Sequence, residues 1–301
     1  MPALAYLHYD VFTSVPLLGN QLAVFPDGSG LDAGLMQRLA REMNFSESTF
    51  VLPSETPGTD VRMRIFTPAA EMPMAGHPTI GTTFALADAG TIPAGAPRFV
   101  FGLNVGPTPV DLEWDGPRLR FAWMTQQAPI FDEPVADRAG VAGALGLREA
   151  DLVPGLPVQA VSCGVPFLFV ALRDRATVDR AISDAAAFGR LAASVGVRLP
   201  IFLFARLPDG EPATVHSRMF APELGITEDP ATGGASGPLG CYLVRHGLVH
   251  GEAARRILSH QGVAMGRASE IHIEITGDAE AITRVRVGGR AVRVGRGELD
   301  L

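Results

Sequence analysis

The sequence contains no lysine, and its basic side chains other than histidine are all arginine. A pyridoxal phosphate enzyme needs a lysine to form the Schiff base with its cofactor, and a Walker A loop needs a lysine on the phosphates of its nucleotide. Enzymes that form lysine Schiff bases with carbonyl substrates are excluded for the same reason. The missing residue therefore removes three large classes of function.

The sequence also has few cysteines, no long apolar run and fewer basic than acidic residues. Cys163 and Cys241 are far apart and form no CxxC pair, which disfavours a structural zinc site. The longest apolar run, 165–172, is too short to span a bilayer, and the first residues lack the pattern of a signal peptide. A net charge of -7 and a pI of about 5.5 argue against a nucleic-acid or anionic-membrane partner. We therefore expect a cytoplasmic protein.

What is present is an internal repeat. Residues 64–68 read RIFTP and residues 218–222 read RMFAP, about half the chain apart. Each is followed by a loop and then by a segment rich in small residues, 76–90 and 233–247, which predicts a helix ending in glycine. VFTSVPLLGNQLAVF and VSCGVPFLFVAL form a third matched pair, each with two strands around a Val-Pro turn. Three matched blocks in the same order indicate a duplicated domain.

The remaining segments are mostly typical of strands. Alternating or apolar β-rich patterns mark VRMRIF, RFVFGL, PVDLEW, RLRFAW, EIHIEI, RVRVGG and AVRVGR, and outer helices are predicted at 31–43 and 176–196. We expect an α+β protein with two pseudo-symmetric domains, 1–127 and 128–301. Each is a curved, mostly antiparallel sheet around one central helix, and residues 285–301 return to the first domain or stay in the second.

The two predicted helix starts are candidate anion sites. In AGHPT, Pro78 suits the first helical position, which places His77 at the N-cap, and Gly76 allows close approach of a ligand. The second start, which includes Gly233 and Gly234, has the same character. Unpaired N–H groups and the helix dipole favour an anion at both, so a carboxylate bound between facing halves needs no lysine. Glycine-rich caps without a ligand are the alternative, but their matched positions favour a site.

The carboxylates differ between the halves. Glu47 precedes the strand STFVL, whereas the matching position of the second half is Ile201. Asp229 stands just before the second helix, where the first half has the apolar segment 72–74. A partly desolvated glutamate can act as both acid and base near neutral pH. The alternatives are a solvated loop glutamate for Glu47, a neutral capping histidine for His77 and an N-cap for Asp229.

These residues lie in sequence segments that resemble those of a known protein family. NFSESTFVL, RIFTPAAEMPMAGHPTIGTTFAL, SCGVPFLFV, RMFAPELGITEDPATGGASGPLGCYL and VRVGGRAVRVGRGEL resemble the signature blocks of the PhzF-like phenazine biosynthesis family, which shares the diaminopimelate epimerase fold. The resemblance runs from near residue 9 to the end of the chain. It is carried most specifically by AGHPT and EDPATG with NFSE upstream.

The resemblance implies an active site between two similar domains and a homodimer. The family's namesake isomerises trans-2,3-dihydro-3-hydroxyanthranilate without a metal or an organic cofactor. A glutamate at the position of Glu47 moves a proton between ring carbons. Substrate is bound at the positions of Gly76 and His77 and at the second helix start, here Gly233 and Gly234. The position of Asp229 adds a polar contact.

Two departures from related patterns bear on the chemistry. The family's second-helix motif resembles DPATGSA, whereas this chain has Gly234 in place of the serine and so lacks one hydroxyl donor. Diaminopimelate epimerase relatives use one cysteine at each helix start, and here neither start carries a thiol. Racemisation by two thiols is therefore disfavoured, and Cys163 and Cys241 are expected to be packed core residues.

We therefore expect a proton-transfer isomerase acting on a small, carboxylate-bearing, cyclic substrate, with Glu47 as the acid and base. An amino-acid epimerase is one alternative, and it needs a second base from His77 or Asp229. A non-catalytic small-molecule binding protein of the same fold is another. A metal-dependent lyase would rely on His246 and His250, which flank the glycine that ends the second helix.

Overall fold

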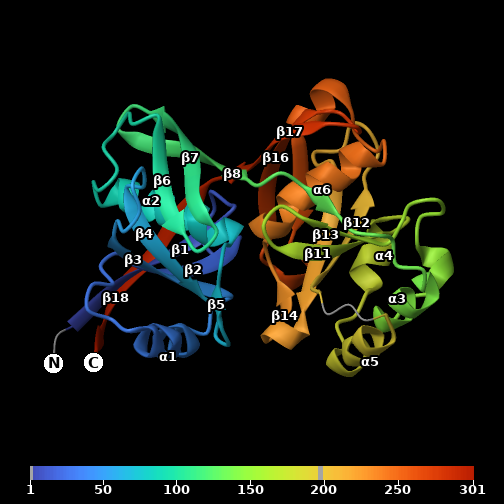
Figure 1. Ribbon diagram of the computed structural model, residues 1–301, viewed down its shortest axis with the longest axis horizontal. Helices are drawn as coiled ribbons and strands as arrows, with labels where there is room; N and C mark the ends of the chain where they lie inside the picture. The colour runs from blue at the N-terminus through green and yellow to red at the C-terminus, as the bar shows by residue number, and fades with distance from the viewer. Residues whose placement is uncertain (1–2, 196–198) are drawn as a thin grey trace. The chain divides into compact units, whose positions relative to one another are not determined.

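The computed structural model describes residues 3–195 and 199–301, which form two compact units (Figure 1). The first unit runs to Gln126 and takes in Arg286–Leu301, and the second is Gln127–Val285. The sequence left the placement of residues 285–301 open. In the structure β18 (Ala291–Asp300) pairs with β1 (Ala3–Val11), so the end of the chain is part of the first unit.

The first unit is a curved sheet around the helix α2 (Gly76–Asp88). The strands pair in the order β18, β1, β2, β3, β4, β6, β7, β8, with β5 beside β4. The pairs β2–β3 and β4–β6 are parallel and the others are antiparallel. The remaining elements of this unit are α1 (Ala33–Met43), β2 (Asn20–Phe25), β3 (Glu47–Pro53), β4 (Val61–Phe66), β5 (Glu71–Met72), β6 (Arg98–Leu103), β7 (Gly106–Asp115) and β8 (Arg118–Gln126).

The second unit repeats this plan around the helix α6 (Gly233–Arg245). The pairs β11–β12 and β13–β15 are parallel, as β2–β3 and β4–β6 are, and β12–β13 is antiparallel like β3–β4. The strands are β9 (Ile130–Phe131), β10 (Gln159–Ser162), β11 (Pro166–Ala171), β12 (Ile201–Arg206), β13 (Val215–Ala221), β14 (Ile226–Asp229), β15 (Ile257–Gln261), β16 (Ser269–Gly277) and β17 (Ile282–Gly289), which crosses into the first unit. The helices are α3 (Arg138–Ala144), α4 (Arg175–Arg180), α5 (Ala185–Val195) and the 3₁₀ turns η1 (Glu149–Asp151), η2 (Pro222–Leu224), η3 (Gly251–Arg255) and η4 (Val263–Met265).

This repeated pairing confirms the predicted fold class, two similar α+β units with mostly antiparallel sheets. Both central helices lie where the sequence predicts them, and each is buried over nearly its whole length. Gly90 and Gly247 follow the two helix ends with φ of 75° and 69°. This left-handed conformation is the one expected of a glycine that ends a helix.

The predicted outer helix at 176–196 is wrong as a single helix. It is broken into α4 and α5 at residues 181–184, and residue 196 lies outside the described residues. The Asp184 carboxylate accepts the N–H groups of Ala186 and Ala187 and so starts α5. The Arg218 guanidinium donates to carbonyls at the end of α4. The break is thus set by a partner from a distant strand, which helical periodicity does not reveal.

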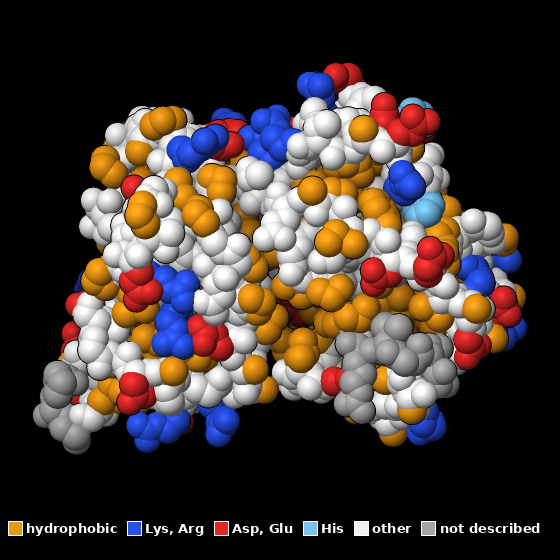
Figure 2. All heavy atoms as spheres, viewed as in Figure 1, with side chains coloured by type: hydrophobic (Ala, Val, Ile, Leu, Met, Phe, Trp, Pro, Cys, Tyr) orange, Lys and Arg blue, Asp and Glu red, His pale blue; other side chains and the backbone are white. Residues whose placement is uncertain are grey.

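On the face shown in Figure 2, blue and red side chains are interspersed within each unit. Arginines form ion pairs with neighbouring carboxylates, for example Arg98 with Asp111 and Arg284 with Glu274. Within residues 3–195 and 199–301, no helix is long and apolar enough to cross a membrane.

Candidate active site

Glu47 is the first residue of β3, and its carboxylate faces the central helix of the first unit. Side chains alternate along a strand, so Glu47 and Thr49 share a face. The Thr49 hydroxyl lies 2.8 Å from that of Thr82 on α2, which shows that this face is turned toward the helix. The Glu47 side chain is only 12% exposed, and its Oε2 atom lies 3.2 Å from Nδ1 of His77. A nearly buried carboxylate therefore meets the first turn of α2.

His77 is the second residue of α2, not its N-cap as the sequence predicted. The N-cap is Ala75, whose side chain has no hydrogen-bonding atom, and the helix begins at Gly76. Pro78 is the third helical residue, where the N–H group still has no partner within the helix, so the proline does not mark the start. Because His77 points back along the helix, its imidazole lies between Glu47 and Asn20. The Asn20 Nδ2 atom is 3.3 Å from His77 Nδ1.

Burial keeps the imidazole of His77 neutral. Burial lowers the pKa of His77 to about 3, and a hydrogen bond to the Gln21 backbone opposes this shift only in part. The 3.2 Å contact with Glu47 is therefore made by a neutral ring and is not an ion pair. The Nδ2 group of Asn20 can only donate, so its contact with His77 needs Nδ1 as the acceptor.

The start of α2 keeps polar groups available to a ligand. No side chain caps the helix, so its first N–H groups lack the partner that a serine or aspartate N-cap provides. The Nε2 atom of His77 is buried and has no hydrogen-bond partner within the described part of the chain. A buried polar atom without a partner is rare and points to a missing one. This end of α2 can therefore receive an anion with hydrogen-bonding oxygens.

The second unit presents Asp229 at the matching place. Asp229 ends β14, is 3% exposed and accepts a hydrogen bond of 2.6 Å from the Thr232 hydroxyl. Thr232, not Asp229, is the N-cap residue of α6. Gly233 and Gly234 are the first two residues of the helix and both are buried. The second helix start thus has a carboxylate three residues before its N-cap.

Two polar residues of these sites were not singled out from the sequence. Asn20 holds His77, and Gln261 makes hydrogen bonds with the loop that carries Asp229. The signal for Asn20 was that only it and Gln21 are polar in the otherwise apolar block VPLLGNQLAVF. The structure brings Glu47, Gly76 and His77 together in the first unit, and Asp229, Gly233 and Gly234 in the second. That both groups face one cleft stays a prediction.

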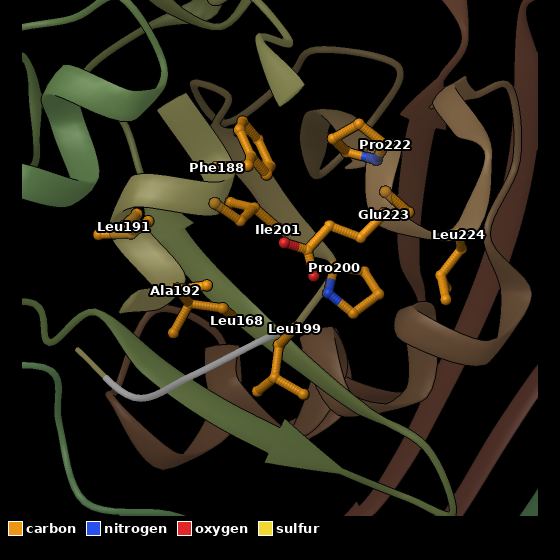
Figure 3. Close-up of a pocket in the computed structure, with 11 residues that line it drawn as sticks. Leu168, Phe188, Leu191, Ala192, Leu199, Pro200, Ile201, Pro222, Glu223 and Leu224 are labelled. Carbon is orange, nitrogen blue, oxygen red and sulfur yellow. The ribbon is translucent and has the colours of Figure 1, made fainter. Parts of the chain in front are cut away.

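An apolar pocket of about 50 Å³ in the second unit does not coincide with either group (Figure 3). Side chains of α5, β12 and η2 line it, and the Glu223 side chain lies near Pro200 and Pro222. None of the residues that line it is a predicted site residue. Its chemistry, one carboxylate in an apolar wall, does not bear on the proton-transfer site.

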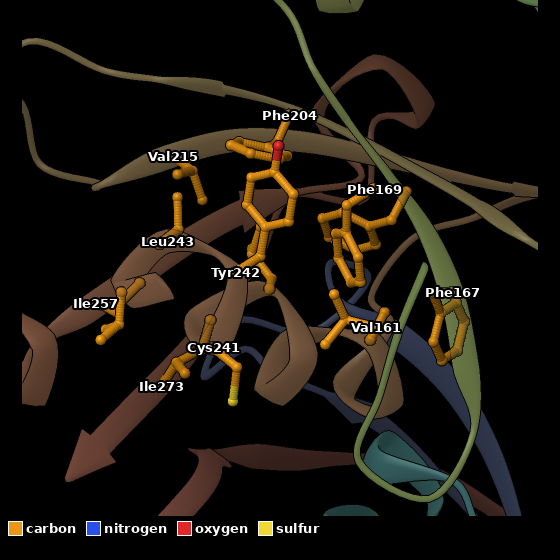
Figure 4. Close-up of a cluster of buried hydrophobic side chains, with 14 of the residues drawn as sticks. Val161, Phe167, Phe169, Phe204, Val215, Cys241, Tyr242, Leu243, Ile257 and Ile273 are labelled. Carbon is orange, nitrogen blue, oxygen red and sulfur yellow. The ribbon is translucent and has the colours of Figure 1, made fainter. Parts of the chain in front are cut away.

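Both cysteines are packed in the core of the second unit. Cys163 and Cys241 are fully buried, and their sulfur atoms are 3.9 Å apart. Figure 4 shows Cys241 on α6 among side chains that include Ile273. The contact with Cys163 and burial raise the pKa of the Cys241 thiol. A thiol in this state is a poor base and nucleophile.

Comparisons with known proteins place the whole chain in one family. The family model described as "Phenazine biosynthesis-like protein" (PhzC-PhzF) matches residues 9–297. A protein named trans-2,3-dihydro-3-hydroxyanthranilate isomerase from Pseudomonas fluorescens is 37% identical over 296 residues, which cover 98% of this chain and 99% of that protein. A crystal structure of a PhzF-family phenazine biosynthesis protein from Bacillus anthracis matches with a TM-score of 0.87 and 28% identity, covering 100% of both chains.

These matches define the protein as an isomerase of the epimerase-like fold. The chain belongs to the PhzC-PhzF family of phenazine biosynthesis-like proteins. A hydroxyproline epimerase from Agrobacterium vitis aligns with a TM-score of 0.69 at 14% identity, over 99% of this chain and 92% of that one. That likeness shows the shared fold alone.

Proposed function

We propose that this isomerase moves a proton between ring carbons of a small cyclic carboxylate, with Glu47 as the acid and base. The proposed substrate is trans-2,3-dihydro-3-hydroxyanthranilate or a close analogue, because the relative from Pseudomonas fluorescens is named for it. One observation carries the proposal. Glu47, nearly buried, lies 3.2 Å from a neutral His77 at an uncapped helix start.

The proposed reaction needs one residue for both proton transfers. The Glu47 carboxylate takes a proton from a ring carbon, and the electron pair of that C–H bond moves into the adjacent π-system. The glutamic acid then returns the proton to another ring carbon on the same face, so no atom or electron is gained or lost. The neutral ring of His77 lies 3.2 Å from Oε2 of Glu47 and holds the carboxyl group in place without exchanging a proton with it.

The proposed binding groups lie at the two helix starts. Gly76 and His77 offer an N–H group and the buried Nε2 atom, and Gly233 and Gly234 offer N–H groups at the start of α6. Asp229 supplies an acceptor for an amino or hydroxyl group of the substrate. Gly234 has no hydroxyl, so the substrate loses one hydrogen bond that a serine would make. We propose that this difference tunes affinity among related carboxylates.

The remaining properties of the proposal follow the family and the composition. We propose that the enzyme acts in the cytoplasm as a homodimer, without a metal or an organic cofactor, and binds neither nucleic acid nor membrane. The acidic composition, with a net charge of -7, supports the last point. The buried, unbonded thiols of Cys163 and Cys241 support a reducing compartment.

The test is incorporation of deuterium from D₂O into trans-2,3-dihydro-3-hydroxyanthranilate, followed with the native protein and with Glu47→Gln. We expect labelled isomer with the native protein and none with the variant, since a carboxamide cannot take the proton. Glu55→Gln is the matched control, because Glu55 is an exposed glutamate of the same unit. Equal labelling by native protein and Glu47→Gln would overturn the role of Glu47. If the native protein were inactive on this compound, the proposed substrate would be wrong.

A further inference from the structure

Gln261, the last residue of β15, is fully buried beside the start of α6. Its Nε2 group donates to the Asp229 carbonyl at 2.7 Å and to the Thr232 hydroxyl at 2.9 Å. Its Oε1 atom accepts the Thr232 N–H at 3.1 Å. One side chain thus makes three hydrogen bonds to the loop between β14 and α6, which carries Asp229.

These bonds fix the direction of the Thr232 hydroxyl. Asp229 offers a carbonyl that needs a donor, and Thr232 offers an N–H that needs an acceptor, so the amide of Gln261 fits in one orientation only. Nε2 then donates to the Thr232 oxygen. That hydroxyl therefore directs its own proton to the Asp229 carboxylate, 2.6 Å away. The chain of bonds runs from Gln261 through Thr232 to the carboxylate.

The first unit shows that the fold does not need this chain. Strand register makes Met72 the counterpart of Asp229, since Ile65 pairs with Met72 and Met219 with Asp229. The residue before each central helix is Ala75 in one unit and Thr232 in the other.

The same comparison gives the counterpart of Gln261. Val61 lies opposite Phe101, and Val215 lies opposite Ser259, so the residue two places further along is Leu103 in the first unit and Gln261 in the second. The first unit therefore builds the same architecture with three apolar residues at these places. The second unit has Asp229, Thr232 and Gln261 at the same three places.

We propose that Gln261 is a positioning residue, which acts through Thr232 to hold the Asp229 carboxylate and the first turn of α6 in the geometry that receives substrate. This inference rests on the proposed function, in which Asp229 contacts the substrate. Gln261 itself touches no reacting atom. It supplies the fixed donor that leaves Thr232 with one orientation.

The test compares isomerase kinetics of Gln261→Met, Thr232→Val, Thr232→Ser and Asp229→Asn with those of the native enzyme. Methionine and valine keep the shapes and remove the hydrogen bonds, so we expect kcat/KM to fall about tenfold in each. Thr232→Ser keeps the hydroxyl and restores activity to within about twofold. The division of the loss between kcat and KM in Gln261→Met should match that of Asp229→Asn.

A double variant separates positioning from a structural role. If Gln261 acts through Asp229, then adding Gln261→Met to Asp229→Asn lowers kcat/KM little further. Gln159→Met is the matched control, because Gln159 is another buried glutamine of this unit that bonds a carbonyl and a side chain. We expect it to lower stability and leave kcat/KM unchanged. Additive losses, or an equal loss in Gln159→Met, would overturn the proposal.

A second measurement does not depend on activity. The ¹⁵N side-chain amide signal of Gln261, assigned by its loss in Gln261→Met, is expected to exchange slowly with solvent and to shift in Thr232→Val. If the native protein is inactive on the substrate and the signal shifts, the proposed function fails and the hydrogen-bond chain stands. If the signal does not respond to Thr232→Val, the proposed chain is wrong whatever the activity.

Discussion

Arg218 binds Glu228 through two parallel hydrogen bonds of 2.8 and 2.7 Å. Arg64 binds Glu71 in the same way, with the same two distances. These arginines open the repeated pentapeptides, and their partners lie just before the matching residues Met72 and Asp229. The repeated arginine therefore ties a central strand to the short strand that precedes each central helix. It is a structural residue that holds the site's framework.

We expect Arg218→Lys to lower the free energy of unfolding by about 3 kcal/mol. A lysine keeps the charge, but it cannot make the paired hydrogen bonds to Glu228 and still reach the carbonyls of Val178 and Ala181. Urea denaturation measures the loss. Arg284→Lys is the control, since Arg284 is half-exposed beside Glu274, and it should lose less than about 1 kcal/mol. Equal losses in the two variants would contradict the structural role.

The central helix of the first unit leaves no room for a side chain at Gly81. A Cβ atom there would lie 2.5 Å from Leu22 and 2.6 Å from Val11. We expect Gly81→Ala to destabilise the protein by about 1–3 kcal/mol, although alanine favours a helix. Gly189→Ala, in α5, meets no neighbour within 4 Å among the residues that the structure describes, and it should stabilise by about 0.5–1 kcal/mol. Thermal unfolding of both variants checks the opposite signs.

The thiols of Cys163 and Cys241 are expected to be silent in the native protein. Both are buried, and the pKa of the Cys241 thiol is raised by its contact with Cys163 and by burial, so little thiolate forms. A thiol reagent such as 5,5′-dithiobis(2-nitrobenzoic acid) should label neither cysteine before unfolding and both after it. Cys163→Ala should keep isomerase activity. Rapid labelling with loss of activity would revive the two-thiol mechanism.

Acid should weaken the first unit through His77. Its folded pKa of about 3 lies below the usual value of 6.5, so the unfolded chain binds an extra proton between these values. The contribution of His77 is complete above pH 6.5 and is lost as the pH falls from 6.5 toward 3. Between about pH 7 and about pH 5, the free energy of unfolding should fall less steeply in His77→Gln than in the native protein.

His246 and His260 titrate in both proteins and cancel in this comparison, since burial lowers the pKa of each. Parallel slopes for the native protein and His77→Gln would mean that folding leaves the pKa of His77 unshifted. The ring would then be charged below about pH 6.5, and the neutral state assigned to it would be wrong.

The sequence by itself determined the family, the duplicated plan, both central helices and the isomerase class. These follow from local patterns: period-two strands, small-residue helices ended by Gly90 and Gly247, and motifs such as AGHPT and EDPATG. Local signals suffice here because propensity and capping act between residues close in the chain. They also named Glu47 and His77 as a site, and the 3.2 Å contact between them is the geometry that such a site needs.

Only the tertiary structure decided which distant residues serve these groups. Parallel pairing of β13 with β15 brings Gln261 to Thr232, and the start of β2 brings Asn20 to His77. An arginine on β13 ends α4, which breaks the helix expected at 176–196. The N-cap of α2 is Ala75, and Pro78 is the third helical residue, where its missing N–H removes no bond of the helix. Hydrogen bonds across long stretches of chain depend on sheet register, and no pattern of neighbouring residues encodes it.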